Sequence, residues 1–137
     1  MGSCPARSGQ IESYLQPLDR KIDMVSSKDI GRAAADLLRE EWSGVRIVEL
    51  SGPQKYSPRD EAAAFAAALG HDVKAVEVPR AEWEQRFRRE GMRHPEARIR
   101  MLDGFNEGWI DFQCDGTERR TGAVELAEVL SELAAGA

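Results

Sequence analysis

The hydrophobic positions of this chain follow two periods, one typical of helices and one typical of strands. Between residues 30 and 38, apolar side chains recur at helical spacing, which predicts an amphipathic helix with one buried face. Ser27 stands before this stripe as an N-cap, and Asp29 falls in the first turn, where a carboxylate suits the helix dipole. Short β-branched runs predict three strands, at Ile22–Val25, Val45–Leu50 and Val73–Val78.

Four further helices are predicted from capping residues and apolar stripes. They begin at Ser57-Pro58, at Ala81, after His94-Pro95 and at Thr121. Five helices and about three short strands indicate an α/β fold. Residues 1–17 are interpreted as a flexible leader or arm, and residues 18–137 as a single α/β domain.

Composition narrows the classes of function. The net charge of −5 argues against binding to nucleic acid or to an anionic membrane surface. No apolar run approaches the roughly 18 residues of a membrane span, and the first ten residues lack the apolar region of a secretory signal. Cys4 and Cys114 are interpreted as free thiols, although a disulfide is an alternative. We therefore expect a cytoplasmic protein that contacts neither membranes nor nucleic acid.

Patterns that carry chemistry are scarce. The chain has no glycine-rich phosphate loop, and the isolated histidines His71 and His94 lack the paired spacing of metal ligands. Asp29 is interpreted as a carboxylate that stabilises its helix rather than as a catalytic acid. We therefore predict no catalytic residue, no cofactor-binding residue and no metal ligand.

Aromatic and methionine side chains are concentrated in the segment from residue 83 to residue 112. Such side chains at helical spacing form a core, line a pocket for a small apolar or aromatic ligand, or make an oligomer interface. All three interpretations stay open for this set. The candidate pocket residues are Trp83, Phe87, Met92, Met101, Phe105, Trp109 and Phe112.

Several motifs resemble those of NmrA-like proteins, which are atypical relatives of the short-chain dehydrogenases/reductases. Val25–Ala35 resembles the family's V-x-x-x-D-I-G-x-x-A-A segment, and residues 48–57 are similar to its x-E-L-x-G-P-x-x-Y-S segment. The order of later features also resembles the family, and the similarity extends from Leu18 to Leu133. These later features are Ala68-Leu69-Gly70, Val73 to Pro79, Trp83, Gly91-Met92, Phe105-Asn106-Glu107-Gly108 and the helix after Thr121.

The resemblance implies that this chain corresponds to the C-terminal, substrate-side half of the family's fold, without the Rossmann half. Binding of NAD(P)H is then expected only where a separate Rossmann partner is present. Without that half, the apolar faces of residues 30–38 and of strand Val45–Leu50 would be exposed. We expect a homodimer or a partner chain to cover them.

Three functions remain open at this point. The first is a non-catalytic module that binds a small ligand or a protein partner, related to the substrate lobe. The second is part of an NAD(P)H-dependent reductase that needs a separate dinucleotide-binding chain. The third is an oligomerisation module without a ligand. We expect the isolated chain not to be an enzyme.

Overall fold

Capping residues set the limits of the helices in the computed structural model, which describes residues 9–135. Helix α3 (Pro58–Leu69) begins with a reciprocal capping box. The Ser57 hydroxyl accepts a hydrogen bond from the backbone N–H of Asp60, and the Asp60 carboxylate accepts one from the backbone N–H of Ser57. Gly70 ends this helix with a left-handed φ of 73°. These predicted limits are confirmed.

Five helices and six short strands are present among the described residues, so the predicted α/β class is confirmed. The helices are α2 (Ser27–Leu37), α3, α4 (Trp83–Arg89, after the 3-10 turn η1 at Arg80–Glu82), α5 (Glu96–Glu107) and α6 (Leu126–Ala135). The strands are β1 (Gln10–Ser13), β2 (Ile22–Asp23), β3 (Val48–Ser51), β4 (Lys55–Tyr56), β5 (Lys74–Glu77) and β6 (Glu118–Thr121).

The strands form three two-stranded sheets. β1 pairs in parallel with β5, β3 pairs in parallel with β6, and the short β2 and β4 pair antiparallel. Strands β4 and β6 are absent from the sequence prediction. β6 is polar, with the sequence Glu-Arg-Arg-Thr, and therefore has no apolar alternation to detect.

Several predicted limits were wrong. Ser27 was predicted as an N-cap, but it is the first residue of α2, and the Ser26 hydroxyl caps the helix by accepting from the backbone N–H of Lys28. The strand predicted from Val45 begins only at Val48, and the Val45 side chain is 94% exposed, so the preceding residues are loop rather than sheet. Thr121 was predicted to cap the last helix, but it is the final residue of β6, and α6 begins at Leu126. A threonine before an apolar stripe signals a cap only where the backbone is free to turn, and here the ladder with β3 keeps it extended.

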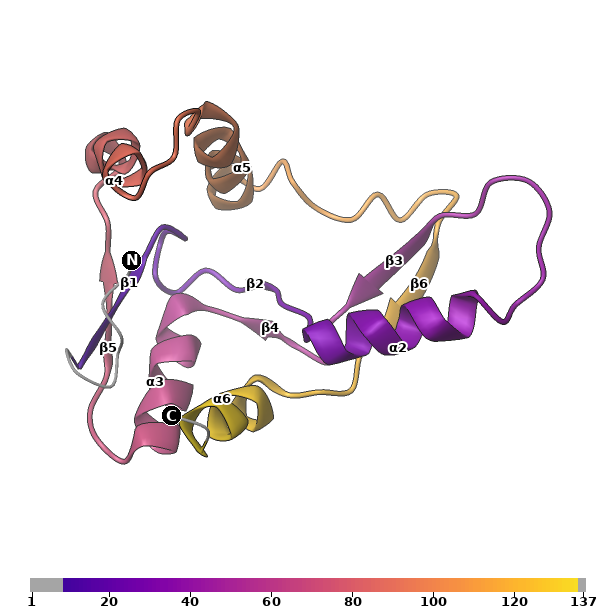
Figure 1. Ribbon diagram of the computed structural model, residues 1–137, viewed down its shortest axis with the longest axis horizontal. Coiled ribbons are helices and arrows are strands. Elements are labelled where there is room, and N and C mark those ends of the chain that lie inside the picture. Colours follow the sequence, from indigo (N-terminus) through magenta and orange to yellow (C-terminus); the bar gives the residue numbers. More distant parts are fainter. Residues whose placement is uncertain (1–8, 136–137) are drawn as a thin grey trace.

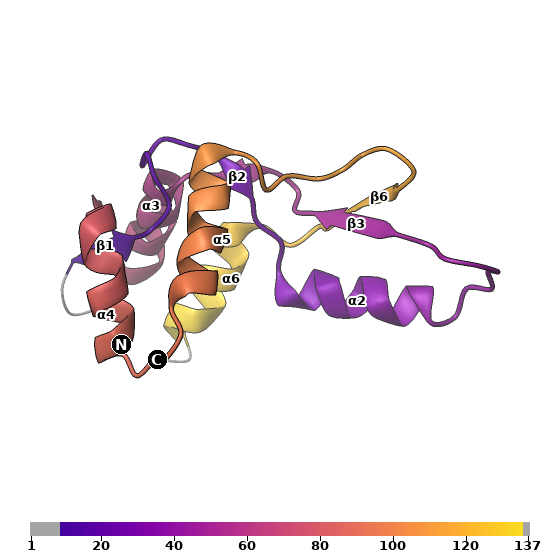
Figure 2. The same ribbon diagram turned by 90° about the horizontal axis from the view of Figure 1, so that it is seen from above.

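The molecule is elongated (Figure 1). At one end lies the body, which we define as β1, β2, β4, β5 and α3 to α6. At the other end lies the arm, which we define as α2, β3, β6 and residues 38–47. Figure 2 shows α2 running alongside the β3–β6 ladder and away from the body.

The core of the body forms where α4 and α5 meet the end of β5. Trp83 and Phe87 are fully buried there, together with Val78, Ile99 and Leu102. The Trp83 Nε1–H donates to the Val78 carbonyl oxygen at 2.8 Å, which satisfies the polar atom of this large side chain. The Tyr14 ring stacks against both aromatic rings, with centroids 5.6 Å from Trp83 and 4.8 Å from Phe87.

The segment before β2 is tied to the body by the side chain of Asn106. Its Oδ1 accepts from the backbone N–H of Gln16 at 2.8 Å, and its Nδ2 donates to the Tyr14 carbonyl oxygen at 2.9 Å. Residues 10–13, which fall in the predicted leader or arm, form β1. Residues 1–8 of the predicted leader lie outside the described part of the chain.

Candidate functional site

The seven candidate pocket residues do not share one site. Trp83 and Phe87 are core residues with no exposed surface, and Met92 packs against them. Met101 and Trp109 lie at the surface, with 44% and 54% of their area exposed. Trp83 and Phe87 lie on α4 and Met101 and Phe105 on α5, whereas Met92, Trp109 and Phe112 lie outside the helices, so the seven residues do not form one helical face.

Phe105 and Phe112 lie on one groove of the body. The groove runs between the β2–β4 pair and the C-terminal end of α5, and it has a volume of about 290 Å³. Its apolar walls are Ile22, Phe105, Ile110 and Phe112, and its polar lining is Arg20, Lys21, Asp23, Lys55 and Asp111. The Arg119 guanidinium carbon lies 4.6 Å from the centroid of the Phe112 ring. Apolar walls with a few polar groups are the usual composition of a small-molecule site.

Arg20 is the most distinctive polar residue of this groove. Its guanidinium donates to the carbonyl oxygen of Asn106, in the last turn of α5. A cation at this position suits the negative end of the helix dipole. Gly108 allows the approach, because a Cβ at this position would overlap the Arg20 Nη2 atom. Sequence reasoning missed Arg20 and Lys55, since a single basic residue in a turn gives no periodic signal.

A second surface feature lies on the arm. Large apolar side chains are exposed there, although the spacing of residues 30–38 predicted that this helix face would be buried. Of the predicted stripe, Ala33 and Leu37 are partly buried, whereas Ile30 on α2 and Leu38 just after the helix are exposed. The exposed side chains are Ile30 at 50%, Leu38 at 83%, Trp42 at 51%, Val45 at 94% and Ile47 at 52%.

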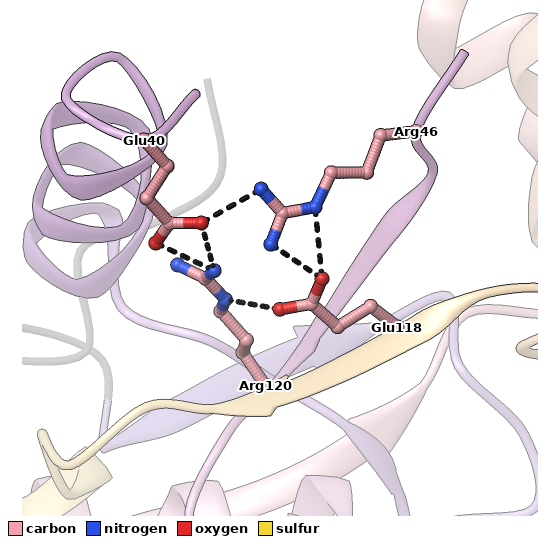
Figure 3. A network of polar contacts seen from close by, with 4 residues as sticks. All are labelled: Glu40, Arg46, Glu118 and Arg120. Atoms are coloured by element: carbon pink, nitrogen blue, oxygen red, sulfur yellow. Dashed lines mark hydrogen bonds and ion pairs between the residues drawn. The ribbon is translucent and has the colours of Figure 1, made fainter. Parts of the chain in front are cut away.

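Charged residues at the free end of the arm neutralise one another in a closed ring (Figure 3). Arg46 donates to Glu40 at 2.7 Å and to Glu118 at 2.6 Å. Arg120 donates to Glu40 at 2.8 Å and to Glu118 at 2.9 Å. Hydrogen bonds from Arg120 and Arg46 lower the pKa of Glu40, and hydrogen bonds from Arg46 and Arg120 lower the pKa of Glu118. Two charges of each sign cancel, so the ring joins the 38–47 loop to β6 without adding net charge.

Asp29 joins the arm to the body. Its carboxylate is 5% exposed, and Oδ2 accepts from the backbone N–H groups of Ala123 at 3.0 Å and Val124 at 2.9 Å. Both donors belong to the segment that leads into α6. From the first turn of α2, Asp29 therefore stabilises a distant loop, a contact that the sequence did not predict.

Two other carboxylates accept hydrogen bonds from segments distant in sequence. Glu49 accepts from the Thr117 hydroxyl at 2.7 Å and from the backbone N–H groups of Gln113 and Cys114, and these hydrogen bonds, led by that from Thr117, hold the pKa of Glu49 below its ordinary value. Glu125 accepts from the buried Tyr56 hydroxyl, which lowers the pKa of Glu125. In these contacts each carboxylate fixes a loop or a helix start.

Other chemistry has little support in the described region. Among residues 9–135, no three His, Cys, Asp or Glu side chains are grouped closely enough to hold a metal ion. Cys114 is an exposed free thiol, and Cys4 lies outside the described residues. Within the same range, no helix has the length and apolar character needed to cross a membrane.

Comparison with known proteins returned no match to a protein-family model and none to a curated protein sequence. The resemblance to NmrA-like proteins is therefore carried by the quoted motifs alone, and it stays a prediction.

Proposed function

We propose that this chain is a non-catalytic interaction module that forms a homodimer through its arm. The observation that carries the proposal is the run of five large apolar side chains between residues 30 and 47, each at least 50% exposed. Contiguous exposed apolar surface is uncommon on monomeric proteins and marks sites of association. Scattered exposed apolar residues need no such explanation, but these lie on one helix and the loop that follows it.

The β3–β6 ladder supports the same proposal. It is parallel and has only two strands, and parallel sheets usually have both faces covered. Two-stranded sheets are at best marginally stable without packing against other elements. Both strands also have an open edge in the described chain, where backbone groups can pair with a further strand. An added chain would cover the ladder and the α2 face together.

The charges of the arm favour a second copy over a partner of opposite charge. Lys28 pairs with Glu132 at 2.5 Å, Arg32 pairs with Asp29 at 3.5 Å, and the four-residue ring is internally neutral. Two chains that each carry a net charge of −5 repel one another, and a surface with its charges paired internally minimises that repulsion. A two-fold axis through the arm would place the same apolar residues opposite one another.

The predicted relation to the NmrA-like substrate lobe suggests a different occupant. In that case a separate dinucleotide-binding chain would cover the arm, and the pair would act as an NAD(P)H-dependent reductase. A homodimer forms from this chain alone, whereas the reductase needs a second, different chain. Measuring the mass of this chain in solution therefore tests the homodimer.

Sedimentation equilibrium at micromolar concentration tests the proposal. We expect a dimer for the native chain and a monomer for Leu38→Glu, because a charge at this position would be buried in the interface without a partner. Met101→Glu is the matched control, since Met101 is also exposed but lies on α5, outside the arm. It should leave the dimer intact.

A native chain that sediments as a monomer would overturn the homodimer. So would dissociation of both variants to the same extent. A saturable change in tryptophan fluorescence on titration of this chain alone with NADPH would overturn the non-catalytic assignment.

A further inference from the structure

We propose that the groove between the β2–β4 pair and the end of α5 binds a small aromatic anion, such as an aromatic carboxylate. This inference is independent of the proposed association through the arm, because the groove lies on the body. Its volume of about 290 Å³ is at the lower end of the roughly 300–1,000 Å³ typical of ligand sites. A molecule of one or two rings therefore matches its size.

The walls of the groove suit a flat apolar ligand. Phe105 and Phe112 are only partly buried, so their rings still offer surface within the groove. Ile22 and Ile110 complete the apolar lining. Aromatic rings gain from offset or edge-to-face contact in addition to the burial of area, which favours an aromatic ligand over an aliphatic one of similar size.

The charge of the groove favours an anion. Its lining contains three basic residues, Arg20, Lys21 and Lys55, against two acidic ones, in a chain whose net charge is −5. Both acids are engaged: Asp23 pairs with Lys55 at 3.2 Å, and Asp111 Oδ1 accepts from the backbone N–H of Phe112 at 2.8 Å. Once the pair between Asp23 and Lys55 is set aside, Arg20 and Lys21 remain with the single carboxylate of Asp111, so the lining keeps one net positive charge.

Arg20 is the residue placed to hold the anionic group. Its guanidinium carries five N–H donors, and among the described residues one acceptor is recorded for it, the Asn106 carbonyl oxygen. A guanidinium held at one end by the backbone can present its remaining donors to a carboxylate in a bidentate manner. Lys21 adds a weaker positive charge, because its side chain is 61% exposed and its Nζ lies 3.6 Å from the carboxylate of Asp60.

The end of α5 does not oppose an anion as strongly as a bare helix C-terminus would. The Gly104 carbonyl oxygen accepts from the backbone N–H groups of Gly108 at 2.9 Å and Ile110 at 3.2 Å. The Asn106 carbonyl oxygen accepts from Arg20. These hydrogen bonds and the guanidinium partly offset the negative end of the α5 dipole beside the groove.

The probes are 1-naphthoate and its uncharged analogue 1-naphthalenemethanol, titrated into the full chain and followed by amide NMR shifts. We expect naphthoate to bind about tenfold more tightly than the alcohol, with shifts at the amides of residues 105, 110 and 112, because a charge-assisted hydrogen bond is lost with the alcohol. Arg20→Gln should reduce the ratio of the two affinities to about threefold, the part that Lys21 still supplies. Arg93→Gln removes the same charge from an exposed position outside the groove and should leave the ratio unchanged.

A further variant guards against loss of structure, since Arg20 also stabilises the end of α5. Lys21→Gln changes an exposed side chain and should weaken naphthoate binding by about threefold without affecting the alcohol. Absence of saturable shifts for both probes up to millimolar concentration would overturn the inference. Equal affinity for the two probes, or shifts centred on Trp109 rather than on the groove, would also overturn it.

Discussion

Replacement of Asp29 by alanine tests whether one buried carboxylate holds the arm to the body. The side chain of Asp29 is 5% exposed and accepts two backbone hydrogen bonds from the segment before α6. Alanine removes both acceptors but keeps good helix propensity at this position. The effect on stability should therefore come from the lost contacts and not from the helix itself.

The expected magnitude follows from the surroundings of the two donors. Val124 is 6% exposed, so its N–H would be left unpaired in a buried position at a cost of about 1–3 kcal/mol. Ala123 is exposed, and water can replace the lost acceptor there. Loss of a first-turn carboxylate adds about 0.3–1 kcal/mol through the helix dipole. The pair with Arg32, whose side chain is 67% exposed, adds little. We expect a loss of roughly 1–4 kcal/mol in total.

Urea unfolding measures this free energy, and Asp36→Ala is the matched control. Asp36 lies in the last turn of the same helix and is exposed, so its removal should be neutral or slightly stabilising. Hydrogen exchange at the Val124 amide should accelerate in Asp29→Ala and stay unchanged in Asp36→Ala. If the two variants unfold within about 0.5 kcal/mol of each other, within the usual range of a surface substitution, the carboxylate does not join the arm to the body.

The remaining predictions concern a pair of glycines and one carboxylate. Gly52→Ala should destabilise the protein by about 1–3 kcal/mol, because the added Cβ would overlap the backbone carbonyl of Met24. Gly31→Ala should stabilise it by about 0.5–1 kcal/mol, because Gly31 lies inside α2 and no atom lies within 4 Å of the added Cβ. Thermal unfolding of both variants measures these changes. Thr117→Val should raise the pKa of Glu49 towards its ordinary value in a carboxyl-carbon NMR titration, because the hydroxyl is the strongest of the contacts that lower it. Because the pKa of Glu49 is lower in the folded state than in the unfolded state, Glu49 stabilises the fold above its ordinary titration range, and this stabilisation is lost as pH falls through the folded pKa. Thr117→Val should therefore make the free energy of unfolding less sensitive to pH in this range.

Much of the fold was predictable because local signals agreed with tertiary structure. The capping box at Ser57, the stop at Gly70 and the pairing of Trp83 with Phe87 at one helical turn all describe interactions within a few residues. The strands β4 and β6 were missed for the opposite reason. They are two and four residues long, and β6 is polar, so pairing with a distant segment rather than any local pattern defines it.

The groove was only half predictable. Phe105 and Phe112 were selected because they belong to an aromatic series, and they lie in the groove together. Arg20 and Lys55 come from segments 50 or more residues away in sequence, and nothing local relates them to α5. The sequence also could not distinguish the buried Trp83 from the exposed Trp109, because both were predicted at apolar positions of a helix. Trp83 is fully buried, whereas Trp109 lies beyond the end of α5 and is 54% exposed. Burial depends on which distant segments pack against a residue, and the local spacing of apolar residues does not specify those segments.

The arm shows the same limit of local patterns, because apolar residues that the helical spacing predicted to be buried are exposed in the described chain. A stripe of apolar residues predicts that a helix face is buried, but the prediction does not specify whether the covering surface belongs to the same chain. For α2 the stripe extends through Ile30 and Leu38, and both side chains are at least half exposed. The free energy gained from burying such side chains is about 1.5–3 kcal/mol each, which is enough to favour association when several are covered together. The exposed face of α2 is therefore better explained as one side of an interface than as an error of the pattern, and the sedimentation of Leu38→Glu against Met101→Glu decides between these explanations.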